Sequence, residues 1–200
     1  MITIIDYNLG NVGSIYNMLT KIGEQCIVSS DSDVILKSDR LILPGVGSFD
    51  NGINNLRNKR LIEPLNEFVK VKKKPILGIC LGMQLMAASS HEGKENGLLW
   101  IPLEVVGFKE QTAYNGTIPV MGWNYVSPKE KNPLLNTEGN RYYFVHSFFF
   151  ETNKYEILTA SVNNFNYCAA FQNDNVFGVQ FHPEKSHKYG MELLQNFCKL

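Results

Sequence analysis

The sequence lacks any surplus of charge and any apolar run long enough to cross a membrane. Its 19 basic and 19 acidic residues balance to a formal net charge of zero over 200 residues. A nucleic-acid-binding domain usually carries a basic surplus, so we expect no nucleic acid among the partners. No run approaches the roughly 18 apolar residues of a membrane-spanning helix, and we therefore expect no membrane partner.

The sequence also has few cysteines and no sign of a targeting segment. The four cysteines form no C-x-x-C pair and stand far apart, at Cys26, Cys80, Cys168 and Cys198. This spacing indicates neither a zinc site nor a disulfide framework, and we expect no metal and no cofactor. The opening stretch, MITIIDYNLG, lacks the basic and apolar regions of a signal peptide, so we expect a cytoplasmic protein.

Apolar stretches of strand length alternate with helix-like stretches through the first half of the chain. Expected strands cover 2–7, 25–30, 39–44 and 75–79, and expected helices cover 11–23, 52–71 and 81–90. This alternation predicts a mostly parallel sheet with helices on both faces.

The pattern changes after residue 100, where prolines, glycines and aromatic residues become frequent. Short strand-like stretches lead to a last helix, and they cover 103–108, 141–150, 156–162, 167–172, 176–181 and, for the helix, 187–200. We expect these strands to add an antiparallel part to the same sheet. Without a repeat or a linker, residues 1–200 are expected to form one α/β domain.

The segment PILGICLGMQ at 75–84 places Cys80 between two glycines where a strand meets a helix. The spacing Gly78-x-Cys80-x-Gly82 is that of the G-x-S-x-G nucleophile turn, with sulfur in place of oxygen. We expect glycines there because side chains would collide in so sharp a turn. The N–H groups and dipole of a helix N-terminus favour the nucleophilic thiolate. A buried structural cysteine beside two packing glycines is the competing interpretation.

His182 and Glu184 supply a candidate base and a group to orient it. The apolar stretch before them ends in His182-Pro183-Glu184, and the fixed φ of proline gives the two side chains a stiff relation. Glu184 can accept a hydrogen bond from one imidazole nitrogen while the other nitrogen faces the thiol. Alone, a His-Pro-Glu segment at a strand end is a weak signal.

A glycine-rich loop, Gly45-Val46-Gly47, follows the expected strand that ends at Pro44. Glycines let the backbone come close to a ligand and turn its N–H groups freely. An N–H of this loop and that of Leu81 can together form an oxyanion hole. An ordinary strand-to-helix turn is the alternative.

LPGVGSF, GICLGMQ and QFHPEKS, in this order and each at an expected strand end, together resemble the class I glutamine amidotransferases. The stretches IPVMGWN at 118–124 and YYFVHSF at 142–148, with the opening IDYNLGNVGSI, resemble the HisH family. That family comprises the glutaminase subunits of imidazole glycerol phosphate synthase. The resemblance covers essentially the whole chain and implies a flavodoxin-like, mostly parallel sheet flanked by helices, with glutamine as the substrate.

The resemblance also implies roles for individual residues. Cys80 would form a thioester during hydrolysis of glutamine to glutamate and ammonia, with His182 and Glu184 completing the triad. The residues matched to the oxyanion hole are Val46, Gly47 and Leu81. The residues matched to substrate binding are Gly45, Gln84, Glu92, Tyr142, Val145, His146 and Ser147. Glu92 is matched on its offset alone, and most of the aromatic segment 142–148 fits a core strand equally well.

The HisH family works as a heterodimer with a (β/α)8-barrel synthase subunit. Ammonia passes to that subunit, which makes imidazole glycerol phosphate and aminoimidazole carboxamide ribonucleotide in histidine biosynthesis. Trp123 and Lys185 lie in motifs matched to the interface. The alternatives are core packing for Trp123 and a solvated charge for Lys185.

One departure from the family pattern keeps other functions open. Val120 stands where the family has histidine before MGWN. A paralogous subunit supplying ammonia for the amidation of a bacterial surface sugar is therefore an alternative. A stand-alone thiol hydrolase such as a peptidase is a rival of another class, but it has no use for a docking face. A non-catalytic subunit is a third alternative, and the intact triad argues against it.

Overall fold

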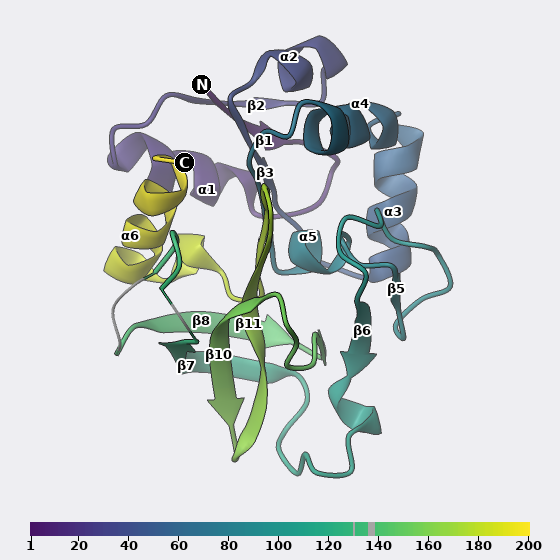
Figure 1. The fold of residues 1–200 in the computed structure, drawn as a ribbon, viewed down its shortest axis with the longest axis vertical. Coiled ribbons are helices and arrows are strands. Elements are labelled where there is room, and N and C mark those ends of the chain that lie inside the picture. Colours follow the sequence, from purple (N-terminus) through teal and green to yellow (C-terminus); the bar gives the residue numbers. More distant parts are fainter. Residues whose placement is uncertain (130, 136–138) are drawn as a thin grey trace.

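A nine-stranded sheet runs through the residues that the computed structural model describes, which are 1–129, 131–135 and 139–200 (Figure 1). Its strands, in their order across the sheet, are β2 (Cys26–Ser29), β1 (Ile2–Ile5), β3 (Arg40–Leu43), β4 (Ile76–Ile79), β12 (Val176–Val179), β11 (Phe165–Asn173), β10 (Glu156–Val162), β7 (Val120–Pro128) and β8 (Arg141–His146). Neighbours from β2 to β12 are parallel, and neighbours from β12 to β8 are antiparallel. The expected fold class is confirmed.

Helices cover both faces of the parallel half. The helices and helical turns are α1 (Val12–Lys21), α2 (Ser32–Lys37), α3 (Phe49–Asn58), α4 (Ile62–Asn66), the π-helical η1 (Glu67–Val71), α5 (Leu81–Gln84), the 3₁₀ turns η2 (Phe108–Glu110) and η3 (Pro183–Lys185), and α6 (His187–Phe197). α1 and α6 pack on one face, at the left in Figure 1, and α2, α3 and α4 pack on the other. Strands buried on both faces are mostly apolar, and β1 and β4 are buried along their whole length with Thr3 as the one polar residue. None of the described helices is both long and apolar enough to span a lipid bilayer.

The single helix expected over 52–71 is wrong. The chain breaks between α3 and α4 at Arg60, which adopts a φ of 56°. Pro64 explains the break, because in a continuous helix its ring would clash with the Arg60 carbonyl and leave that carbonyl without a donor. The hydrophobic period of the sequence did not distinguish one long helix from α3, α4 and the π-helical η1.

The helix expected over 81–90 is also wrong in its length, since α5 makes only one turn. The carbonyls that would continue it accept hydrogen bonds from another segment instead. Leu98 N–H donates to the Leu85 carbonyl at 2.8 Å, and Trp100 N–H donates to the Met86 carbonyl at 2.9 Å. Pairing with residues 97–101 therefore overrides the local helical preference. The short strands β5 (Ser89–Ser90), β6 (Glu104–Gly107) and β9 (Phe148–Phe149) then form a small separate sheet.

The antiparallel half of the sheet curls until β8 meets the chain just beyond β12. Tyr143 of β8 forms an isolated bridge with His182, whose N–H donates to the Tyr143 carbonyl at 2.9 Å. The Tyr143 N–H donates to Ser186 Oγ at 3.0 Å, and the Ser186 hydroxyl donates to the His182 carbonyl at 2.6 Å. These bonds hold β8 beside the carboxyl ends of β4 and β12.

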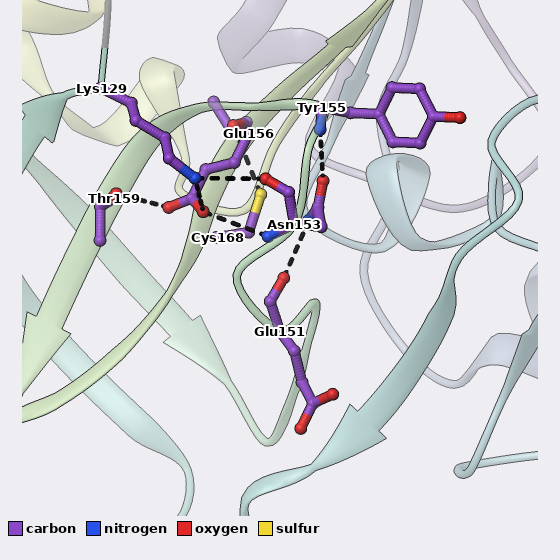
Figure 2. Close-up of polar contacts among 8 residues, drawn as sticks. Lys129, Glu151, Asn153, Tyr155, Glu156, Thr159 and Cys168 are labelled. Carbon is purple, nitrogen blue, oxygen red and sulfur yellow. Dashed lines mark hydrogen bonds and ion pairs between the residues drawn. The ribbon is translucent and has the colours of Figure 1, made fainter.

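A buried carboxylate ties the start of β10 to the chain that follows β7 (Figure 2). The Glu156 side chain is fully buried and accepts hydrogen bonds from the Thr159 hydroxyl and from the Asn153 N–H, the latter at 3.3 Å. The half-exposed Lys129 ammonium lies 3.4 Å from the same carboxylate. Because a buried charge is costly unless it is paired, these partners keep Glu156 in place.

Candidate active site

The turn between β4 and α5 holds Cys80 in a strained backbone conformation, with φ of 54° and ψ of −112°. Residues other than glycine rarely adopt positive φ, and such strain clusters at functional sites. A Cβ added at Gly78 would lie 2.7 Å from backbone atoms of Gly82 and Met83, and one added at Gly82 would lie 1.9 Å from the Leu43 carbonyl oxygen. The expected reason for the two glycines is confirmed.

His182 and Glu184 form a buried pair directly beyond β12. Nδ1 of His182 lies 2.8 Å from Oε1 of Glu184, and the side chains are only 2% and 1% exposed. Nε2 is buried and makes no hydrogen bond of standard geometry among the described residues. The Cys80 sulfur nevertheless interacts with the imidazole and favours its protonated form. Burial lowers the pKa of His182, yet Cys80 and Glu184 outweigh burial and raise the pKa to about 9. The site therefore favours the protonated, positively charged form of the His182 imidazole.

The three other cysteines lie in settings that favour the neutral thiol. Burial raises the pKa of Cys168 and of the partly buried Cys26, and it raises the pKa of Cys198 to about 12. None of the three lines the cavity that contains Cys80. These settings fit the interpretation that all three are structural.

The glycine loop after β3 approaches the cysteine turn from the neighbouring strand. Gly45 is so close that an added Cβ would lie 2.6 Å from the backbone nitrogen of Gly82. The buried Tyr7 hydroxyl donates to the Pro44 carbonyl at 2.6 Å and fixes the start of the loop. Gly47 has a φ of 107°, a conformation that side chains disfavour.

A cavity of about 290 Å³ brings the predicted groups together. Residues predicted from the sequence that line it are Val46, Gly47, Cys80, Leu81, Gln84, Glu92, Val145, His146, Ser147 and His182. They come from the carboxyl ends of β3, β4, β12 and β8 and from the loop after β5. In an open α/β sheet, ligands bind outside the carboxyl ends of the strands, so this cavity is where the fold favours a site.

Other predicted residues lie outside the cavity wall. Glu184 stands behind His182, and Gly45, the first residue of the glycine loop, lies against the backbone of Gly82. Tyr142 is completely buried and stacks on Phe181 with ring centroids 3.9 Å apart, so it packs in the core and does not line the cavity. Trp123 is 43% exposed and Lys185 is exposed, which excludes core packing for Trp123.

Three residues of the site were missed from the sequence. Pro119 and Phe148 line the cavity, and Gln180 lies beneath it, fully buried. Gln84 Nε2 donates to the Phe148 carbonyl and to Oε1 of Gln180, each at 3.0 Å. A polar Gln180 at the end of an apolar strand, two residues before His182, was the available signal.

The cavity wall offers both an acidic and a neutral polar group. Glu92 is half-buried, and burial raises its pKa. The Phe49 N–H donates a hydrogen bond to the Glu92 carboxylate at 2.9 Å, which lowers the pKa by a smaller amount. Burial lowers the pKa of His146 to about 4, so its imidazole is neutral at pH 7. His146 Nδ1 lies 2.8 Å from the Phe148 carbonyl and must donate to it, which leaves Nε2 as an acceptor.

The arrangement suits nucleophilic attack on an acyl carbon. A thiol on a strained turn, an imidazole with an oriented ring and N–H groups of a nearby loop are the parts that thioester chemistry requires. No group of three side chains in the described ranges is arranged to hold a metal ion.

The family model of class I glutamine amidotransferases matches residues 3–200. The chain therefore belongs to the class I glutamine amidotransferase family. Two solved structures share the fold at low identity: a glutamine amidotransferase with a TM-score of 0.77 and 15% identity, and PurLQS from Thermotoga maritima with 0.73 and 19%. They cover 100% and 99% of this chain, which covers 98% and 97% of theirs.

Within that family, the chain groups with the HisH subunits. Proteins named imidazole glycerol phosphate synthase subunit HisH 2 are 50% identical in Methanococcus maripaludis and 44% identical in Pseudomonas aeruginosa. A subunit named HisH from Bdellovibrio bacteriovorus is 42% identical. Each comparison covers the whole of this chain and at least 99% of the relative.

Proposed function

We propose that this chain hydrolyses glutamine at Cys80 and delivers the ammonia to a (β/α)8-barrel synthase subunit in histidine biosynthesis. The observation that carries the proposal is the meeting of Cys80, the His182–Glu184 pair and the glycine loop at one cavity. The HisH names of relatives as similar as 50% supply the pathway. Its relatives are named as subunits of a biosynthetic synthase, and we therefore expect this chain in the cytoplasm.

In the first half of the reaction, the Cys80 thiolate attacks the side-chain amide carbon of glutamine. The new carbon–sulfur bond forms as charge moves to the carbonyl oxygen, which N–H groups of Leu81 and of Val46 or Gly47 stabilise. The carbon–nitrogen bond then breaks, and the leaving nitrogen takes the proton of His182. Ammonia leaves, and a glutamyl thioester remains.

In the second half, His182 takes a proton from water, which attacks the thioester carbon. The carbon–sulfur bond breaks and glutamate leaves, which restores the thiolate and the imidazolium. Glu184 does not change its protonation; it keeps Nδ1 protonated and the ring in place at 2.8 Å.

The cavity wall offers partners for the rest of the substrate. Glu92 presents a carboxylate suited to the substrate's ammonium group, and Gln84 presents an amide one helical turn beyond Cys80. Backbone groups of Val145 and Ser147 and the imidazole of His146 complete the proposed glutamine contacts, and Gly45, outside the cavity wall, would support the glycine loop. Tyr142 would support them only by packing.

The partner would dock on an aromatic face formed by Met121, Trp123 and Tyr125. These side chains alternate along β7 and are 63%, 43% and 62% exposed. The Arg141 guanidinium lies 5.4 Å from the Trp123 ring, and His187 stacks on that ring with centroids 5.7 Å apart. Interfaces are enriched in such aromatic and arginine side chains, so this face fits a protein partner.

Lys185 lies at the edge of the aromatic face and next to the triad. Its ammonium is 5.6 Å from the Tyr143 ring, and Tyr143 is hydrogen-bonded to His182 through the backbone. We expect Lys185 to pair with a carboxylate of the barrel subunit. The thiol-hydrolase alternative has no use for this arrangement.

Val120 does not weaken the assignment. Its side chain is buried in the core beside His146 on β8 and does not line the cavity. The departure lies outside the triad and therefore leaves the proposed hydrolysis of glutamine intact, and the acceptor is tested by the experiment below.

The decisive experiment replaces Cys80 with alanine in the complex with the barrel subunit. Glutamine-dependent synthesis should fall by at least about 1,000-fold, as losses of nucleophiles do, while synthesis from added ammonia should persist. Cys26→Ala is the matched control and should retain activity with glutamine. Product formation from the histidine-pathway nucleotide, and none from a sugar acceptor, separates the two pathways. Glutamine hydrolysis by Cys80→Ala within tenfold of the native rate would contradict the proposal.

A second experiment tests the aromatic face. Trp123→Ala should weaken binding of the barrel subunit by roughly 25-fold or more, the effect of a central interface aromatic. Leu99→Ala removes a 60% exposed side chain elsewhere and should leave binding unchanged. Equal affinities for the two variants by calorimetry would exclude this face.

A further inference from the structure

Gln180 connects the substrate cavity to the nucleophile through a buried amide. It follows β12, and its side chain is 0% exposed. Its backbone N–H donates to the Ala169 carbonyl at 2.8 Å, which fixes the residue against β11. Its side-chain oxygen meets Gln84 Nε2 at 3.0 Å, and its side-chain nitrogen lies 3.7 Å from the Cys80 sulfur.

The neighbours of Gln180 determine which end of its amide faces the sulfur. The carbonyl of Phe148 can only accept, so the Gln84 group that contacts it at 3.0 Å must be the NH₂. The same NH₂ meets the Gln180 amide, which must therefore present its oxygen to Gln84. The NH₂ of Gln180 is left to face Cys80, and the sulfur receives a hydrogen bond.

The thiol hydrogen of Cys80 has a separate partner. In this structure the sulfur lies 3.9 Å from the Val145 carbonyl, a weak acceptor contact for the S–H group. The N–H of Gln180 approaches the sulfur itself and stays in place when the thiol hydrogen leaves. A donor fixed in a buried site gains strength when its acceptor becomes an anion.

We propose that Gln180 is a positioning residue that holds the Cys80 sulfur and stabilises its thiolate. The role rests on the proposed function of Cys80 as nucleophile. It adds a neutral donor on the sulfur to the imidazole of His182. It also joins the two ends of the site, because Gln84, which holds the Gln180 amide, lines the glutamine cavity.

The other titratable groups near Cys80 are unchanged by substitution of Gln180. His182 faces the sulfur from beyond β12. The buried Tyr7, which follows β1, interacts electrostatically with Cys80. His146 of β8 and Glu92 line the same cavity. A changed titration of Cys80 in Gln180→Met, which adds no charge, is therefore attributable to the lost N–H.

The test measures the pH dependence of Cys80 alkylation by iodoacetamide, followed by mass spectrometry of the full chain. Gln180→Met removes the amide at similar length. Gln180→Glu keeps an oxygen for Gln84 and replaces the donor with a second oxygen, whose negative charge also opposes the thiolate. Both variants should shift the half-maximal pH of alkylation upward by about one unit and lower kcat/KM for glutamine about tenfold. Gln172→Glu, at the end of β11, is the matched control and should do neither.

A merely structural role predicts a different result. It would lower the thermal unfolding temperature and leave the alkylation curve of the folded fraction unchanged. If both Gln180 variants keep the native curve within about 0.3 pH unit, the inference is overturned, whatever their activity. If Cys80→Ala still hydrolyses glutamine while the Gln180 variants shift the curve, the proposed function fails and the Gln180 contact stands.

Discussion

Replacing Glu184 with glutamine removes one charge from the buried pair and keeps its shape. The carboxylate lies 2.8 Å from Nδ1 of His182, with side chains 1% and 2% exposed, so solvent cannot replace it. Burial already lowers the pKa of His182, and without Glu184 only Cys80 would oppose it, so the pKa should fall from about 9. A larger share of the imidazole would then be neutral and unable to protonate the leaving nitrogen of the substrate.

The magnitude follows from the strength of the lost interaction. Hydrogen bonds to charged groups contribute about 1.5–3 kcal/mol, and each 1.4 kcal/mol is a factor of ten, so kcat should fall about 10- to 150-fold. KM for glutamine should change little, because Glu184 does not line the cavity. Steady-state glutaminase assays in the partner complex would measure both constants.

Two controls separate this effect from damage to the fold. Glu63→Gln makes the same change at an exposed position of α4 and should keep the native kcat. Synthesis from added ammonia should persist in Glu184→Gln, since it does not use the triad. A kcat within about threefold of native, with an unchanged pH profile, would refute the role given to Glu184.

Three further predictions concern pH, the cysteine turn and the buried carboxylate. The raised pKa of His182 means that its contribution to stability is fully present below about pH 6.5 and lost as pH rises through about 9; kcat/KM should fall above pH 9, as stopped assays across pH would record. Gly82→Ala forces a Cβ to 1.9 Å from the Leu43 carbonyl and should cost more than about 3 kcal/mol in chemical denaturation, whereas Gly13→Ala, in α1 with open space around it, should be neutral or stabilise by up to about 1 kcal/mol. Glu156→Gln should lower the unfolding temperature by roughly 2–8 °C, more than Lys129→Met, because the glutamate is buried and the lysine half exposed; equal shifts by calorimetry would contradict this.

The sequence was informative where the chemistry lies close together along the chain. The Gly-x-Cys-x-Gly spacing predicted the strained turn at Cys80, and His182-Pro183-Glu184 predicted the buried pair, since both are set by a few consecutive residues. The alternation of strands and helices likewise predicted the parallel half of the sheet, because its inner strands β1, β3, β4 and β12 are almost fully buried and read as short apolar stretches.

Long-range pairing limited the rest. The helix after Cys80 stops after one turn because a segment beginning at Gly97 takes its carbonyls, and nothing near Leu85 announces this. α2 went unpredicted because six residues are too few to show a helical period, although Asp31 caps it by accepting from the Asp33 and Val34 N–H groups. Gln180 was missed because of long-range pairing, since its partners Gln84 and Cys80 are 96 and 100 residues away along the chain.

The bridge between Tyr143 and His182 places β8 in contact with both the surface beside Lys185 and the catalytic site. Tyr143 carries its ring under the Lys185 ammonium at the surface, and its carbonyl holds the His182 backbone 2.9 Å away. Two residues along the same strand, Val145 presents its carbonyl to the Cys80 sulfur. Because these contacts belong to one strand, a displacement of β8 would change the positions of the His182 backbone and of the Val145 carbonyl together.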